Sequence, residues 1–293
     1  MPESGDPIPP AVNQPAPSGG ATSVMGKGSI ALIAAAAAAI AAFVAVFRSP
    51  SHSGEPAAPG TSNSEASPAS LAEIRAITEE ARKASLSGDD KTAISLTEES
   101  ARKLEAAAAT SKGAEKVVMD YAAALAKSQN DVLTKYIGAA NKYADAGAAS
   151  LAGLHDSAAL EARVALLSDA ITAHDDALKY FRTISDRIPR ELAARGVAKK
   201  DSDEFLAGFV ANAKIENLLA IHSMEHGMLL AARRRFEILR DNPGRWSVGE
   251  RGALVASETF PAGALTEFNH LGDEIDRLAT KQAELIEERK SGG

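Results

Sequence analysis

A helical repeat of apolar residues runs through most of this chain and limits its fold more than any other feature. From Ser70 to Lys290, aliphatic residues recur every three or four positions, which is the spacing of one face of an α-helix. The alternation typical of β-strands is missing from the same stretch. Aromatic residues make up only 4% of the chain and cysteine is absent, so the core must come from aliphatic side chains. The pattern therefore predicts an all-α protein.

The first part of the helical region, residues 70–110, is expected to form a helical hairpin. Ser70–Glu73 matches a capping box that opens a helix. Gly88 ends this helix, and Asp89 and Asp90 then supply the side-chain oxygens that favour the start of a second one.

The second part, residues 111–290, contains four longer amphipathic segments. Short loops between such segments favour antiparallel neighbours, so we expect an elongated antiparallel four-helix bundle with coiled-coil-like packing. The fourth segment is expected to open at a capping box, Ser247–Glu250, and to be interrupted near Gly252 or Pro261. The first, second and fourth segments are expected at 112–153, 157–196 and 247–290. The third is expected to begin after a cap at Asp201–Glu204 and to end at Asn242–Gly244. The expected core stripe of the second segment is Leu160, Val164, Leu167, Ile171, His174, Leu178, Phe181 and Ile188.

An apolar run from Ile30 to Phe47 precedes the helical region. It has no polar side chain, and ten of its residues are alanine. A hydrocarbon core of about 30 Å requires about 20 helical residues, which residues 28–48 provide. We therefore expect a single transmembrane helix at 28–48 that contacts the membrane through residues 30–47. A cleaved signal peptide and a buried helix of a soluble bundle are the alternatives.

The segments that flank this run have the composition of unstructured chain. Residues 1–27 are rich in proline, and residues 49–69 are rich in serine, proline, glycine and alanine, so we expect a disordered tail and a flexible linker. Lys27 and Arg48 balance the positive charge on the two sides of the run. A short N-terminal tail before a large domain favours an inside N-terminus, which predicts an extracytoplasmic bundle on a single-pass membrane protein.

Five potential metal ligands are predicted to fall at one level of the bundle. His174 takes a core position of the second segment, and His222 and His226 lie one turn apart on the third. Turns near residues 198 and 245 would bring these histidines level with Glu267 and His270 of the fourth segment. Bundles build metal sites from imidazole and carboxylate groups that converge from several helices. The candidate hydrogen-bonding neighbours of the ligands are Asp175, Glu225 and Tyr136.

The preferred ligand set within this level is His222, His226 and Glu267, with His174 as a fourth ligand or a proton carrier. A transition-metal ion is the cofactor that this set predicts. Three other interpretations remain open at this stage: buried polar packing without a ligand, a noncovalent haem held by two imidazoles, and an acid–base centre that uses histidines with lowered pKa.

Arginines gather near the end of the third segment, where Arg233–Arg235 are consecutive and Arg240 and Arg245 follow. Successive helical residues point in different directions, which favours a solvated helix end whose charges complement the helix dipole. The alternative is contact with anionic headgroups or with an acidic partner, assisted by Trp246.

The net charge and the absence of certain motifs exclude several classes of function. The chain has a formal net charge of −7, which argues against nucleic-acid binding. Phosphate-binding loops, dinucleotide fingerprints and nucleophile elbows are absent from the sequence. We therefore expect a membrane-anchored helical bundle that binds a protein partner without catalysis, as a scaffold or sensor. The alternative is an anchored bundle with a His/Glu metal or haem site in its core.

Overall fold

The computed structural model describes residues 68–87, 89–146, 151–154, 156–213, 215–249 and 252–291. Within these ranges the chain forms seven helices and one two-stranded antiparallel sheet. The helices are α2 (Pro68–Ser87), α3 (Asp90–Thr110), α4 (Gly113–Asp145), α5 (Ser157–Ala194), α6 (Lys199–Ala213), α7 (Ile215–Arg240) and α8 (Ala262–Ser291), and the strands are β1 (Trp246–Val248) and β2 (Leu254–Ala256). The predicted helical fold is confirmed apart from this small sheet.

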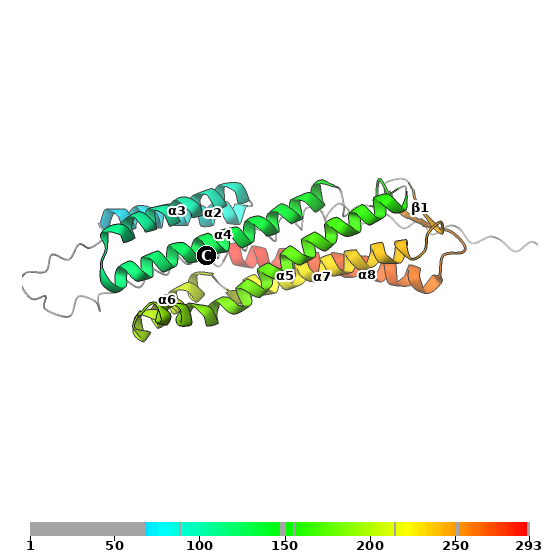
Figure 1. Ribbon diagram of the computed structural model, residues 1–293. Helices are drawn as coiled ribbons and strands as arrows, with labels where there is room; N and C mark the ends of the chain where they lie inside the picture. Colours follow the sequence, from blue (N-terminus) through cyan, green and yellow to red (C-terminus); the bar gives the residue numbers. More distant parts are fainter. Residues whose placement is uncertain are drawn as a thin grey trace, which may run out of the picture.

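The helices form an elongated bundle (Figure 1). Each long helix packs against the next one in the chain, α4 against α5, α5 against α7 and α7 against α8. The hairpin of α2 and α3 lies along α4, and the strands lie at the end of the bundle opposite α6. The expected N-terminal hairpin and elongated shape are therefore present.

Caps and prolines explain several of the helix boundaries. The Asp89 side chain accepts a hydrogen bond from the Thr92 amide at 3.1 Å and caps α3 as predicted. The Asp156 side chain caps α5 in the same way. Helix α2 begins at Pro68, two residues before the predicted capping box, because proline fits the first turn of a helix. Helix α5 continues through Pro189 to its end.

Two expected segments differ from the structure. The third forms two helices, α6 and α7. Helix α6 begins at Lys199, whereas the expected start lies after Asp201–Glu204. The expected helix start at Ser247–Glu250 is wrong, because Ser247 lies in β1, opposite Val255 of β2. Gly252 between the strands has a φ of 77°, a conformation that favours glycine and suits a turn rather than a helix.

Two large apolar cores and one small cluster fill the bundle, and the small cluster of Met228, Ala231 and Ile275 joins α7 to α8. The helical-hairpin core is built from α2, α3, α4 and α6, from the C-terminal half of α5, from the start of α7 and from the end of α8. The β-hairpin core joins the N-terminal half of α5, the end of α7, the start of α8 and the strands. On α5 the boundary between the cores lies between Ile171 and Ala177, and on α7 between Ile221 and Leu229. Buried polar side chains occupy that boundary.

The described residues contain no helix that is long and apolar enough to cross a membrane. The predicted membrane helix at 28–48, the tail and the linker lie outside the described residues.

Candidate metal centre

Three buried side chains converge at the boundary between the two cores. His174 comes from α5, and His222 and Glu225 come from one turn of α7. Their exposed fractions are 0%, 1% and 1%. His174 is part of the predicted core stripe of α5, while His222 and Glu225, three residues apart, share one face of α7. The site is therefore held by two packed helices rather than by loops.

The ligand atoms of these residues form a triangle of the size that a metal ion requires. His222 Nδ1 lies 3.3 Å from His174 Nε2 and 3.3 Å from Glu225 Oε2, and the third side measures 3.7 Å. The point in the plane of the three atoms lies about 2.0 Å from each of them, and a point above the plane by less than 1 Å lies about 2.1 Å away, which are the lengths of zinc–nitrogen and zinc–oxygen bonds. Ligands of a tetrahedral ion with such bonds are about 3.3–3.5 Å apart. The triangle fits a four-coordinate ion.

Tyr136 of α4 completes the surroundings of Glu225. Its hydroxyl donates a hydrogen bond to Oε1 of Glu225, the carboxylate oxygen that is not part of the triangle. Its ring meets the rings of His174 and His222 edge-on, with centroids 5.2 and 6.0 Å apart. In protein metal sites, a carboxylate that binds the ion commonly also accepts a hydrogen bond from a neighbouring residue.

The charge of Glu225 decides what the site can bind. Burial raises the pKa of Glu225, but the imidazoles of His222 and His174 outweigh burial and lower the pKa to about 2. The carboxylate is therefore ionised at neutral pH. A buried anion needs a positive partner. Either a proton shared with an imidazole or a metal cation can supply that charge.

His226 lies beside the triangle rather than in it. Its ring stacks on that of His174 with an interplanar angle of 5° and centroids 5.5 Å apart. Its Nε2 lies 2.9 Å from Oδ1 of Asp175, and 27% of its side chain is exposed. Burial lowers the pKa of His226 more than the Asp175 carboxylate raises it, so the neutral imidazole is favoured.

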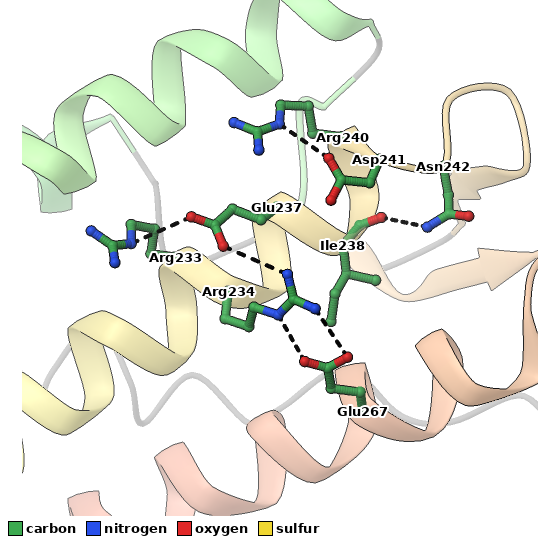
Figure 2. Close-up of polar contacts among 8 residues, drawn as sticks. All are labelled: Arg233, Arg234, Glu237, Ile238, Arg240, Asp241, Asn242 and Glu267. Carbon is green, nitrogen blue, oxygen red and sulfur yellow. Dashed lines mark hydrogen bonds and ion pairs between the residues drawn. The ribbon is translucent and has the colours of Figure 1, made fainter.

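The other two predicted ligands lie elsewhere. Glu267 is exposed and binds Arg234, with Oε1 2.7 Å from Nε (Figure 2). His270 is also exposed, one turn further along α8. The structure therefore brings together His174, His222 and the neighbouring His226, but it does not bring Glu267 and His270 to them.

The helical register of α8 accounts for this difference. The β1–β2 hairpin lengthens the connection between α7 and α8, so the turn is not centred near residue 245 as expected. Gln282 donates a hydrogen bond to the Ile221 carbonyl at 3.4 Å, which places Gln282 at the histidine level. Gln282 lies 12 residues beyond His270, about 18 Å along the helix axis.

Three arginines near the end of α7, Arg233, Arg234 and Arg240, form ion pairs with neighbouring carboxylates. Arg234 lies between Glu237 and Glu267, and Arg233 contacts Glu237 from the other side (Figure 2). Arg240 contacts Asp241 at the helix end. Arg235 differs, because its guanidinium lies over the Phe268 ring, 4.1 Å from the ring centroid, and burial lowers its pKa. The interpretation of a solvated helix end therefore fits the three paired arginines but not Arg235.

Sequence reasoning placed Glu225 among the neighbours of the site rather than among its ligands. The signal that could have found it is the spacing of His222 and Glu225, since residues three apart on a helix face the same partner.

The two imidazoles also converge on one point beside Glu225, whereas the axial ligands of a haem lie on opposite sides of its ring. The geometry therefore favours an ion over a haem.

Comparisons with protein-family models, with curated proteins and with solved structures found no match.

Proposed function

We propose that this protein is a membrane-tethered helical bundle whose core binds one divalent transition-metal ion through His174, His222 and Glu225. The observation that carries the proposal is the triangle of ligand atoms, whose sides of 3.3, 3.3 and 3.7 Å fit one ion. The tether is the apolar run and linker expected from the sequence.

Zinc is the ion that suits this centre best. Two imidazoles and one carboxylate also bind iron(II), on one face of an octahedron. An octahedral ion with bonds of similar length would need ligand atoms about 2.9 Å apart, closer than those of the triangle. The wider spacing favours a four-coordinate ion, with one position left for a water molecule.

The ion is proposed to stabilise the bundle rather than to act on a substrate. All three ligands are at most 1% exposed, whereas catalytic metal sites keep a position open to substrate. The centre also joins α5 to α7 at the boundary of the two apolar cores. Binding of a protein partner, which the sequence also predicts, stays a prediction.

Elemental analysis and thermal unfolding of the full-length chain in detergent test this proposal. We expect one equivalent of zinc in the wild type, and its loss in both His222→Ala and Glu225→Gln. The matched control is His270→Ala, which removes an exposed histidine outside the site and should retain the ion. Free zinc at 100 times its dissociation constant should stabilise the fold by about 2.7 kcal/mol, and the site variants should lose this increment.

Two results would overturn the proposal. One is a wild-type protein that remains free of metal and shows no thermal shift after incubation with zinc, iron(II) or manganese. The other is an equal loss of metal in His270→Ala and His222→Ala, since binding would then not depend on the buried triangle. Circular dichroism shows whether each variant has kept its helices, and the milder Glu225→Gln change leaves the shape of the core intact.

A further inference from the structure

His226 and Asp175 connect the buried centre with the surface of the bundle. Asp175 directly follows His174 on α5, and His226 directly follows Glu225 on α7. The exposed fractions of their side chains are 57% for Asp175 and 27% for His226. From Asp175 through His226 to His174, exposure therefore falls from 57% to 0% over two contacts.

The first contact along this line is close and polar, and the second is a parallel ring stack with centroids 5.5 Å apart. His226 Nε2 lies 2.9 Å from Asp175 Oδ1, and the His226 ring lies parallel to the His174 ring. We call His226 and Asp175 the entry pair. An imidazole nitrogen and a carboxylate oxygen are both zinc ligands, and here they lie outside the triangle rather than in it.

Apolar packing surrounds the centre along the bundle axis. On one side lie Ile171 and Leu229 of the β-hairpin core, and on the other Ala177 and Ile221 of the helical-hairpin core. A hydrated cation that moved through these layers would lose its water without gaining a ligand, which is strongly unfavourable. A route lined by His226 and Asp175 avoids this penalty.

We propose that the entry pair captures a divalent cation at the surface and passes it to His174, His222 and Glu225. This inference rests on the proposed metal site and adds the route by which the ion is loaded and released. Asp175 attracts the cation, and the imidazole of His226 replaces part of its water shell before the ion reaches the triangle. The pair acts on the rate of exchange and not on the final affinity.

The test compares exchange rates in the full-length protein in detergent. Loading with zinc chloride and removal by excess EDTA are followed over time in the wild type, in His226→Phe and in Asp175→Asn. Phenylalanine keeps a ring against His174 but carries no nitrogen, so it removes the ligand without opening a hole. His270→Phe, at an exposed position outside the site, is the matched control.

We expect both variants of the entry pair to load and release zinc at least tenfold more slowly than the wild type. Their stoichiometry should remain one, with the dissociation constant within about threefold of the wild-type value. His270→Phe should exchange at the wild-type rate. Equal slowing in both directions is the signature of a raised barrier, because a change in binding energy would alter the equilibrium as well.

Three results overturn the inference. Wild-type rates in His226→Phe would show that the ion reaches the centre by another route, while the proposed site still stands. A large loss of affinity in His226→Phe would make His226 a ligand of the bound ion instead. Absence of zinc binding in the wild type would overturn the site and the route together.

Discussion

The hydrogen bond from Tyr136 to Glu225 offers the sharpest test of the buried polar cluster. Tyr136→Phe removes one oxygen and leaves the ring in place, so the change creates almost no cavity. It deprives an ionised carboxylate that is 1% exposed of a hydrogen-bond donor. Hydrogen bonds to charged groups contribute about 1.5–3 kcal/mol, so we expect the metal-free protein to lose about 2 kcal/mol of its free energy of unfolding.

The chain supplies a matched control seven residues along the same helix. Tyr143 of α4 is also 1% exposed, but its hydroxyl is buried without a hydrogen-bond partner among the residues that the structure describes. Removal of an unsatisfied buried hydroxyl is neutral or stabilising. Tyr143→Phe should therefore leave the stability unchanged or raise it.

Urea unfolding and calorimetry of the metal-free protein measure both variants. For a domain of this size, a loss of 2 kcal/mol lowers the Tm by about 4–8 °C. The effect of Tyr136→Phe should shrink in a Glu225→Gln background, because the acceptor is then neutral. Equal effects of the two tyrosine changes, or no effect of Tyr136→Phe, would refute the argument that the carboxylate depends on this hydroxyl.

Two further predictions concern glycines and tyrosines outside the ligand set. Gly138→Ala, in α4, should stabilise the protein by up to about 1 kcal/mol, because the new Cβ meets open space and alanine favours helix. Gly227→Ala should gain less in the same urea unfolding assay, since its Cβ would lie 3.0 Å from Leu278 Cδ1; equal gains would contradict the close packing of α7 on α8. Burial raises the pKa of three tyrosines, so their contribution to stability should be constant up to about pH 10 and fall at higher pH, where the unfolded chain gives up these protons more readily. Those residues are Tyr121, Tyr143 and Tyr180. Absorbance at 295 nm should show tyrosinate forming at higher pH in the folded than in the urea-unfolded protein, and coincident curves would contradict the burial.

The local sequence pattern was sufficient to predict the helices and two of the three residues of the site, His174 and His222. The apolar stripe of α5 predicted a buried His174, and a short connection between α5 and α6 made the level of His222 a matter of counting residues. Helix geometry repeats at every turn, so a count of residues converts directly into a distance along the axis. The level at which α5 and α7 meet was therefore accessible from the sequence.

The rotation of α7 about its own axis was not accessible in this way. Glu225 and His226 both lie one turn from His222, and the sequence pattern favoured the histidine as the ligand. In the folded protein Glu225 is buried against Tyr136 and His174, while His226 faces Asp175 at the surface. Packing of α4 and α5 against α7 selects between two adjacent residues 100° apart, and no local signal encodes that choice.

The register of α8 depended on tertiary structure even more. A capping-box pattern at Ser247–Glu250 predicted a helix, but Ser247 pairs with Val255 across a β-hairpin. This hairpin shifts α8 along α7, so Gln282 rather than Glu267 reaches the histidine level. Periodicity of the sequence determined which residues form helices and which faces are apolar. Only the packed structure decided how far each helix slides and turns against its neighbours, because those degrees of freedom depend on contacts between residues distant in the chain.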